Sequence, residues 1–423
     1  MKVVYLNPSG QLGGAEKVLL DILASLKAAE PSFRPHLVVS ADGPLIAKAR
    51  SLGVPTTLLP FPAALARLGD CGAGGPAGRQ IGLPALLGRL TKAGGAAALY
   101  LNRLRHELKR LSPDILHTNG FKMHLLGMWA KPRRTPIIWH IHDYISARPL
   151  MARALPRFAK RCAAIIAISN SVADDVRTVC GDSARVHTIY NAVDLERFSP
   201  AGPQLDLDEL AGLPPATPGT VKVALFATMA RWKGHEVFMR ALSLLPADLP
   251  VRAYIAGDAL YQTDGSQYSI PELRRMAKDL GVAEKVGFTG FIAEPAAAMR
   301  ACDIVVHAST QPEPFGLVII EAMACARAVV ISQAGGAAEL IAAGENALAH
   351  APGDAPGLAA CIMRLARDAN LRAQLGQAGR AAAERRFDRA RPAYQLLPTY
   401  QLVCVSRDLP TVWESSAAHG VVR

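Results

Sequence analysis

The stretch DIVVHASTQPEPFGLVIIEAMA, residues 303–324, shows how this chain folds. Its first seven residues, DIVVHAS, are the apolar, β-branched run of a buried strand, and Pro312 and Pro314 restrict the backbone of the loop that follows. Apolar residues then recur at helical spacing, which predicts a helix from about Phe315 and Gly316. A buried strand followed by a loop and a helix is the repeating unit of a parallel α/β sheet.

The unit recurs in two series that a linker separates. The segments VVYL, HLVVS, DILHT, IIWHI and AAIIAIS are predicted strands of the first series, and VKVALFA, VRAYIAG, VGFTG, DIVVHAS and AVVISQ of the second. We therefore predict an α/β protein with two doubly wound, Rossmann-like domains facing a central cleft. The N-terminal domain is residues 1–200, the Pro- and Gly-rich linker 201–219 and the C-terminal domain 220–390. Residues 391–423 form a tail, for which packing back on the N-terminal domain is one interpretation.

Composition narrows the class of protein. No apolar run reaches the ~18 residues needed to cross a bilayer, and the start MKVVYLNPSG has too short an apolar stretch for a signal peptide. The seven cysteines are widely spaced and form no CxxC pair, which disfavours a disulfide framework or a zinc site. A reducing cytoplasm is the expected location. The glycine-rich segment 61–95 is predicted as a loop with one short helix.

The formal net charge of +12 is concentrated in the N-terminal half. Residues 71–106 contain no Asp or Glu, and residues 131–161 contain only Asp143. A solvated, arginine-rich surface is the simpler interpretation. Attraction to an anionic membrane or to phosphate-bearing substrates is the alternative. Nucleic acid is disfavoured, since no recognition motif accompanies the charge.

Two places in the N-terminal half are candidates for ligand contact. Gly13 and Gly14 follow the first strand, where a glycine pair lets the amides of a helix start approach a phosphate or sugar, although a tight turn explains the pair equally well. Without the full GxGxxG spacing, dinucleotide binding is disfavoured. His142, in WHIHD, follows the end of a predicted strand, where side chains of a parallel sheet face the ligand crevice.

The C-terminal half supplies charged candidates. Arg231 and Lys233 follow the first strand of the second series and could balance the charge of a departing diphosphate. Glu313 and Glu321 are eight positions apart, which is about 12 Å along the axis if the residues between them are helical. That separation suits two contacts with one extended ligand, not the roughly 5 to 9.5 Å between the carboxylates of a glycosidase.

The set of motifs resembles glycosyltransferase family 4, whose fold is the two-domain GT-B fold. The matching segments, in the family's order, are GGAEKVLLDIL, DILH, WHIHD, AISNSVADDV, IYNAVDLERFSP, ARWKGHEVF, EPFGLVIIEAM and AGGAAELI. EPFGLVIIEAM matches the family's paired-glutamate signature and is specific, whereas the others are modest alone. The resemblance covers nearly the whole chain.

The resemblance implies a role for each candidate residue. Glu321 would bind the ribose of a nucleotide, Glu313 the hydroxyls of the donor sugar, and Lys233 with Arg231 the diphosphate. Amides around Phe315, Gly316 and Leu317 would add contacts at the helix start. His142 would face the donor sugar, and Gly13 and Gly14 would lie near the diphosphate or the acceptor.

The chain departs from the family pattern at Thr228, where many members have an arginine five residues before the lysine. Arg231 could serve instead. Asp206 and Asp208 form a DxD pattern, but it lies in the linker, and the resemblance implies no metal and no other cofactor.

The expected activity is that of a retaining glycosyltransferase in cell-surface glycan biosynthesis. A UDP-sugar is favoured over a GDP-sugar as donor, and the acceptor would be a saccharide or a lipid-linked molecule at the inner membrane face. A nucleotide-sugar epimerase of the same architecture and a non-enzymatic sugar-nucleotide or membrane-binding module are the alternatives.

Overall fold

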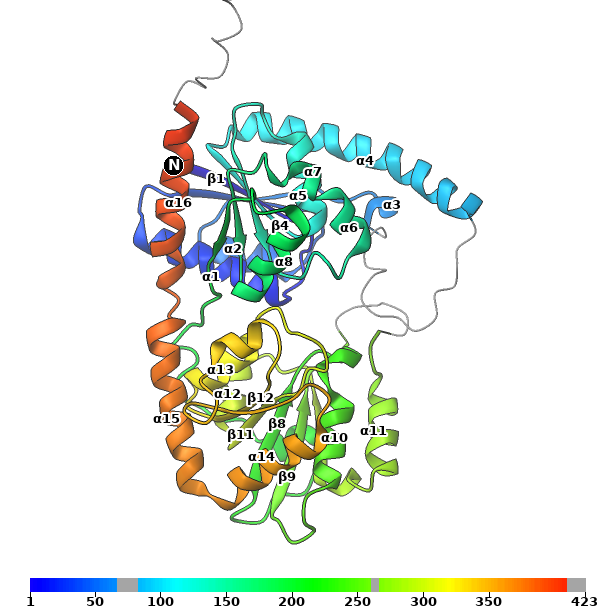
Figure 1. Cartoon of the computed structure of the whole chain (residues 1–423), viewed down its shortest axis with the longest axis vertical. Coiled ribbons are helices and arrows are strands. Elements are labelled where there is room, and N and C mark those ends of the chain that lie inside the picture. Colours follow the sequence, from blue (N-terminus) through cyan, green and yellow to red (C-terminus); the bar gives the residue numbers. More distant parts are fainter. Residues whose placement is uncertain (67–82, 260–265, 409–423) are drawn as a thin grey trace, which may run out of the picture.

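The computed structural model describes residues 1–66, 83–259 and 266–408, and it contains two α/β domains (Figure 1). The N-terminal domain is built on a seven-stranded, fully parallel sheet. In spatial order its strands are β3 (Thr56–Leu58), β2 (Arg34–Val39), β1 (Lys2–Asn7), β4 (Ile115–Asn119), β5 (Ile137–Ile141), β6 (Ala164–Ala167) and β7 (Val186–Thr188). Its helices are α1 (Gly14–Ala29), α2 (Pro44–Ser51), α3 (Ala63–Ala66), α4 (Leu83–Leu111), α5 (Phe121–Ala130), α6 (Pro149–Ala154), α7 (Pro156–Ala159) and α8 (Asn170–Cys180).

The second domain repeats this plan with a six-stranded parallel sheet. Its strands, in spatial order, are β10 (Val286–Gly290), β9 (Val251–Ala256), β8 (Val221–Phe226), β11 (Ile304–His307), β12 (Ala328–Ser332) and β13 (Leu348–His350). The α-helices from the linker onward are α9 (Leu207–Ala211), α10 (His235–Ser243), α11 (Ile270–Asp279), α12 (Pro295–Arg300), α13 (Leu317–Ala324), α14 (Ala355–Arg367), α15 (Ala369–Arg386) and α16 (Arg391–Asp408). Three 3-10 turns complete it: η1 (Arg231–Lys233), η2 (Ala283–Lys285) and η3 (Gly336–Leu340).

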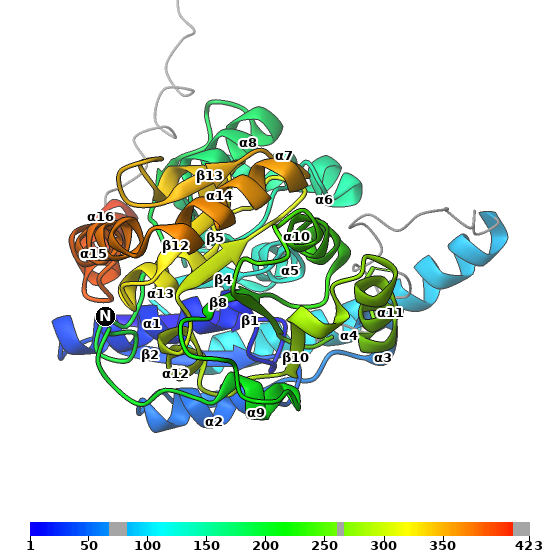
Figure 2. The ribbon, with the colours of Figure 1, turned by 90° about the horizontal axis from the view of Figure 1, so that it is seen from below.

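Each sheet is covered by helices on both faces because its strands are apolar on both sides. Val3 and Tyr5 of β1 pack with α1 and α16, whereas Val4 and Leu6 pack with α4, α5 and α8. The second sheet is covered in the same way, by α10, α11 and α14 on one face and α12, α13 and α15 on the other. Figure 2, a view turned by 90°, shows these layers end-on. This two-sided burial is the arrangement expected of doubly wound parallel sheets.

The order of the strands indicates where a ligand would bind in each sheet. In both sheets the first strand is central, and the chain reverses its direction of travel between β1 and β4 and between β8 and β11. Ligands of such sheets bind beyond the carboxyl ends of the strands at this switch point.

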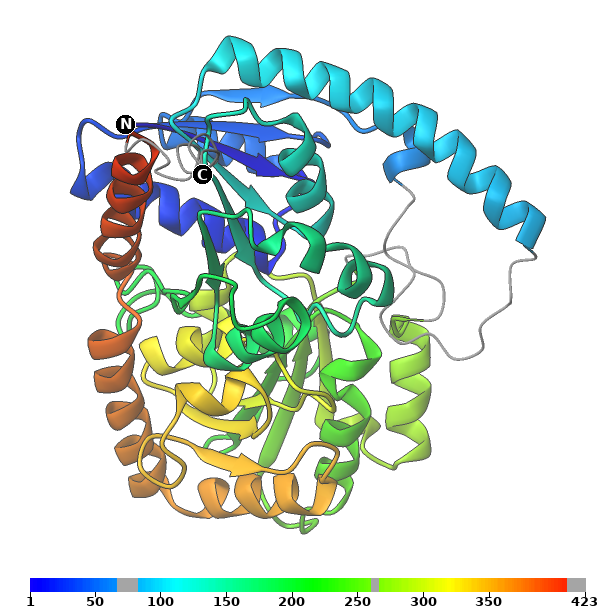
Figure 3. The same cartoon turned by 45° about the horizontal axis from the view of Figure 1, so that its top comes forward.

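The last helix returns to the N-terminal domain. After α15, which lies along the second domain, α16 continues beside α1 (Figures 1 and 3). The Tyr400 hydroxyl lies 3.0 Å from that of Tyr5 and 2.7 Å from Nδ1 of His117. The two domains are thus joined both by the linker and by the crossing into α16.

The structure corrects the expectation for residues 61–95. Helix α4 begins at Leu83, so residues 83–95 are helical and not a loop. Residues 67–82 lie outside the described residues, as does the tail from 409 to 423. Among the helices that the structure describes, none is both long and apolar enough to cross a membrane.

Candidate active site

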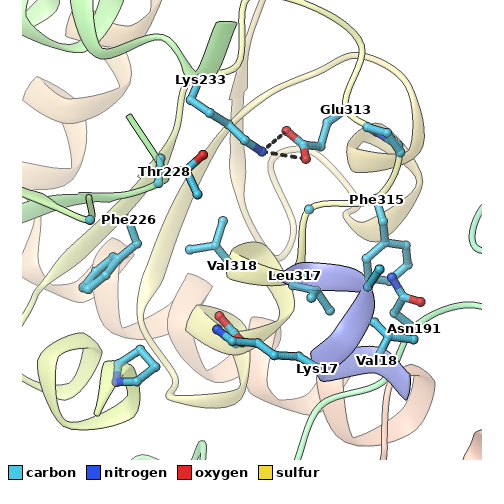
Figure 4. Close-up of a pocket in the computed structure, with 18 of the residues that line it drawn as sticks. Lys17, Val18, Asn191, Phe226, Thr228, Lys233, Glu313, Phe315, Leu317 and Val318 are labelled. Carbon is cyan, nitrogen blue, oxygen red and sulfur yellow. Dashed lines mark hydrogen bonds and ion pairs between the residues drawn. The ribbon is translucent and has the colours of Figure 1, made fainter. Parts of the chain in front are cut away.

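A cavity of about 540 Å³ lies between the two domains, beyond the carboxyl ends of both sheets. Its walls include groups that follow β1, β5, β8 and β11, which are strands of the two switch points or their neighbours. Figure 4 shows α1 of the N-terminal domain opposite the start of α13. The cavity brings together eight of the predicted residues: Gly14, His142, Lys233, Glu313, Phe315, Gly316, Leu317 and Glu321.

Lys233 and Glu313 form a buried ion pair in the wall of this cavity. The Lys233 ammonium donates to both carboxylate oxygens of Glu313, at 2.8 and 2.7 Å (Figure 4). The side chains are only 20% and 9% exposed. Lys233 ends the short turn η1, where Gly234 (φ 78) continues the chain into α10. A Cβ at position 234 would collide with the carbonyl of Ala308, so glycine permits this close packing.

Two residues that the sequence analysis missed complete the surroundings of Glu313. Ser309 donates from its hydroxyl to Oε2 at 2.8 Å, and Nε2 of His307 lies 3.2 Å from the same oxygen. Burial alone would raise the pKa of Glu313, but the Lys233 charge and the contacts with His307 outweigh it and hold the pKa well below its usual range. Glu313 is therefore a charged anchor with little tendency to take up a proton.

The loop after Glu313 aims the start of α13 at the cavity. Gly316 adopts a left-handed conformation (φ 97), so that the helix begins at Leu317. The first amides of a helix have no partner within the helix and are available to an anion. Phe315 is 2% exposed and packs behind the loop. Since residues 313–316 are not helical, the estimate of about 12 Å between Glu313 and Glu321, which assumed a continuous helix, does not apply.

Glu321 lies one turn into α13 and also lines the cavity. Burial raises its pKa, and the charges of Lys17 and Arg197 partly offset that effect. Lys17, on the first turns of α1, lines the same cavity and was also missed by the sequence analysis (Figure 4). It brings a positive charge from the opposite domain.

The N-terminal face of the cavity holds two of the predicted residues, Gly14 and His142. Gly14 opens α1, with Leu317 of the other domain 3.7 Å from where a Cβ would stand. Gly13 precedes it as the N-cap and does not line the cavity itself. His142 follows β5, and its Nε2 lies 3.2 Å from Oδ1 of Asn119. Burial lowers the pKa of His142 to about 4, so its ring is uncharged at neutral pH.

The prediction that Arg231 lies at the mouth of the cleft is wrong for this structure. Its guanidinium donates to Glu272 at 2.9 Å and stacks over the Tyr268 ring at 4.3 Å, so it lines a second hollow on the far side of η1. Thr228, by contrast, lines the main cavity beside Lys233 (Figure 4). In this structure Arg231 therefore does not occupy the place of the arginine that is missing at Thr228.

The DxD pattern of the linker has a structural explanation. Asp206 caps α9, and the buried Asp208 accepts hydrogen bonds from Tyr254 at 2.7 Å and Arg252 at 3.0 Å. These contacts attach the linker to the second sheet. Within the part of the chain that the structure describes, no three His, Cys, Asp or Glu side chains are grouped as metal ligands would be.

A cavity at the facing switch points of two Rossmann-like domains, with a lysine–glutamate pair and a helix N-terminus in its wall, defines the GT-B class of folds. Solved structures agree. Anabaena HepE in complex with UDP-glucose superposes with a TM-score of 0.75 and 27% sequence identity over 95% of this chain and 100% of that one.

Family models match both domains. The description "Glycosyltransferase Family 4" fits residues 12–197, and "Glycosyl transferases group 1" fits residues 215–382. A GDP-mannose-dependent alpha-(1-6)-phosphatidylinositol monomannoside mannosyltransferase of Mycolicibacterium smegmatis is 30% identical over 60% of this chain and 68% of its own length. The chain belongs to glycosyltransferase family 4.

Other relatives match over shorter regions. D-inositol 3-phosphate glycosyltransferase 2 of Catenulispora acidiphila is 36% identical over 42% of this chain and 42% of its own length. A second D-inositol 3-phosphate glycosyltransferase, from Xylanimonas cellulosilytica, is 31% identical over 56% of each chain. The match thus spans about half the length of these curated relatives.

Proposed function

We propose that this protein is a retaining glycosyltransferase that moves a sugar from a nucleotide-sugar donor to a saccharide or lipid-linked acceptor. The observation that carries the proposal is the buried Lys233–Glu313 pair beside the free amides of α13, inside an interdomain cavity. A diphosphate needs positive charge and amide donors, and a sugar needs a fixed hydroxyl acceptor. The wall of the cavity supplies all three.

Lys233 is proposed to exchange partners when the donor binds. Its ammonium contacts Glu313 in the structure, and a diphosphate in the cavity would compete for it. Glu313 would then turn its freed oxygens toward sugar hydroxyls, while Ser309 and His307 hold it in place. Lys17 is proposed to add a second positive charge from the N-terminal domain.

The acid–base properties of the cavity support transfer without a protein base. The pKa of Glu313 is held well below its usual range and that of His142 is lowered to about 4, so neither is matched to proton abstraction near neutral pH. In the proposed step the bond from the sugar to the diphosphate breaks as the bond to the acceptor oxygen forms. The acceptor proton passes to the leaving phosphate, and the acceptor enters from the same face.

A UDP-sugar is the proposed donor. HepE, whose structure holds UDP-glucose, matches this chain almost from end to end, whereas the relative named for GDP-mannose matches 60% of it. The acceptor is proposed to belong to cell-surface glycan synthesis. No metal is proposed to take part, because Lys233, Lys17 and the α13 amides already offer positive charge to the diphosphate.

The test is a panel of UDP- and GDP-sugars, followed by NMR with and without saccharide and lipid-linked acceptors. Acceptor-dependent release of the nucleoside diphosphate, with the anomeric configuration kept, is the expected result. Conversion of the donor sugar into its epimer without acceptor would establish the epimerase instead. Binding without any turnover would identify a non-enzymatic module.

Association with an anionic membrane is a further part of the proposal. On α7 and its flanks Arg153, Arg157, Lys160 and Arg161 are exposed, and Leu150 of the preceding helix α6 is 74% exposed. Apolar and basic groups together suit the surface of an anionic bilayer. We expect binding to vesicles with anionic lipid and not to neutral ones.

The matched variants are R157E/K160E, on α7 and at the residue that follows it, and R275E/K278E on α11 of the other domain, where both replaced residues are also exposed. Only the first pair should weaken vesicle binding. Equal binding by both variants would reject α7 as the contact surface.

A further inference from the structure

Three segments shared with the family, two of which supply the cavity residues Ile168 and Asn191, also meet at one further place. AISNSVADDV (167–176) contains the start of α8, and IYNAVDLERFSP (189–200) follows β7. AGGAAELI (334–341) contains η3 of the other domain. Their meeting point is the side chain of Glu339.

Glu339 reaches from the C-terminal domain to a helix of the N-terminal domain. The amides of Asn170 and Ser171 donate to its two carboxylate oxygens at 2.9 and 2.6 Å. These are the first two amides of α8, where a helix leaves donors free and favours negative charge. The third amide, that of Val172, is taken by the N-cap Ser169. A carboxylate of one domain thus completes the helix start of the other.

Tyr190 extends this contact toward the cavity. Its hydroxyl donates to Oε2 of Glu339 at 2.8 Å and accepts from Nδ2 of Asn170 at 2.8 Å. Burial and the bond to Glu339 raise the pKa of Tyr190 to about 12, so the hydroxyl keeps the proton that it donates. The ring lies 6.1 Å from that of Phe315, centroid to centroid, behind the loop that begins α13.

Tyr144 connects the same helix start with Glu313. Its hydroxyl lies 2.9 Å from Oγ of Ser171 and donates to the backbone carbonyl of Glu313 at 3.3 Å. The Gly336 amide donates to that carbonyl from the other side, at 2.7 Å, two residues before the centre of η3. Gly335 (φ 63) leaves the space that Tyr144 occupies, since a Cβ there would collide with its hydroxyl. The backbone of Glu313 is therefore held by both domains.

We infer that Glu339 is an interdomain positioning residue, whose contact with the α8 start holds the Glu313 loop in place through Tyr190, Tyr144 and the Gly335–Gly336 pair. Glu339 itself touches neither the cavity nor the ion pair. This linkage between Glu339 and the Glu313 loop consists of the contacts described above. Its importance for turnover rests on the proposed function. When the domains separate, the loop loses its N-terminal support, so the donor grip would be complete only in the closed arrangement.

Hydrogen exchange on the full-length protein tests the linkage without any substrate. In Glu339→Gln, amides 170 and 171 should exchange about tenfold faster, as expected when charge-assisted bonds are lost. Peptides covering 312–318 should also exchange faster. The control is Glu345→Gln, a change of the same kind at an exposed glutamate just beyond η3, which should alter neither. Faster exchange confined to the α8 start would overturn the inference.

Tyr144→Phe separates the two ends of the linkage. It removes the hydroxyl that joins Ser171 to Glu313 and leaves the Glu339 contacts intact. Exchange at 312–318 should rise while amides 170 and 171 keep their protection. An unchanged loop in this variant would also contradict the inference, and it remains informative if Glu339→Gln fails to fold.

Kinetics then connect the linkage with turnover. Transfer by Glu339→Gln should fall about tenfold in kcat/KM, as expected when a supporting contact is lost. If the wild-type protein transfers no sugar, the proposed function fails while the exchange result stands. If transfer is normal in Glu339→Gln although the loop has loosened, the positioning role is wrong.

Discussion

The two faces of the cleft differ in their electrostatics. The C-terminal face presents the Lys233 ammonium, the Glu313 carboxylate, whose pKa is lowered, and the N-terminus of α13. Short hydrogen bonds join the ammonium and the carboxylate. The N-terminal face presents glycine backbone at Gly14, the ring of His142, whose pKa is lowered to about 4, and the side chains of Lys17 and Asp143. The same doubly wound plan therefore carries two kinds of binding surface. The C-terminal surface suits the proposed charged donor.

The difference continues behind the N-terminal face. His117, His124 and His140 lie in the core beneath His142, and burial lowers the pKa of each. The rings of His140 and His142 are only 4.2 Å apart. A protonated ring here would repel its neighbours and lose hydration, so this cluster of histidines stays uncharged at neutral pH.

The largest effect is expected when the charged face loses its cation. In Lys233→Ala the diphosphate loses its ammonium contact and Glu313 is left as an unpaired buried carboxylate. Turnover should fall roughly 10²- to 10³-fold, the usual cost of one preorganised contact to developing charge. Steady-state kinetics with the best donor measure it, with the exposed Lys278→Ala as control. Wild-type turnover in Lys233→Ala would remove the proposed role of the pair.

Lowering the pH should destabilise the N-terminal domain before the C-terminal domain. A histidine with a lowered folded pKa binds fewer protons when folded than when unfolded, so its stabilising effect is complete above about pH 6.5 and is lost as the pH falls toward the folded value. That value is about 3 for His117 and about 4 for His142. Each such histidine costs up to about 1.4 kcal/mol per pH unit in that window.

Among the histidines in the described part of the C-terminal domain, only His235 and His350 show a lowered pKa. Hydrogen exchange at pH 6.5 and 4.5, corrected for intrinsic rates, should therefore show greater loss of protection in β1, β4 and β5 than in β8 and β11. Equal loss in both sheets would refute this asymmetry.

Glu321 offers a smaller perturbation of the charged face. Its carboxylate lines the cavity without an ion pair as short as that of Glu313. Glu321→Gln keeps the shape and removes the charge. We expect UDP binding to weaken by about 1 to 3 kcal/mol, the range for one hydrogen bond to a charged group. Calorimetry measures this, with the exposed Glu284→Gln as control. Unchanged affinity would exclude a contact with the nucleotide.

The sequence predicts the central strands well and the edges poorly. All ten predicted strands are present, because strands buried on both faces are continuous apolar runs. The strands β3, β7 and β13 were not predicted, since each has only three residues. Helix α4 was hidden by Gly94 and Gly95, which disfavour a helix by roughly 1 kcal/mol each.

At the site, the sequence identified which residues belong to it better than it predicted where their side chains point. Glu313 and Lys233 were both identified as candidate site residues, but the ion pair between them was not predicted. His307 was missed because it ends an apolar strand, whose residues are expected in the core. Its contact with Glu313 is visible only in the structure. Lys17 could have been found, since it stands one helical turn from Gly14 and so shares its face.

The smallest effect is expected from a substitution of Arg231, whose side chain lies outside the cavity although it is only two residues from Lys233. Residues of a 3-10 turn are ~120° apart, so Arg231 and Lys233 of η1 point in different directions although they are two residues apart. The Arg231–Glu272 pair is 40% and 45% exposed, and exposed pairs stabilise by about 0 to 1 kcal/mol. Arg231→Ala should therefore leave turnover within about twofold of the wild type, and it should lower the free energy of unfolding only slightly. A loss comparable to that in Lys233→Ala would mean that Arg231 leaves Glu272 for the donor, and that the charged face is completed only on binding.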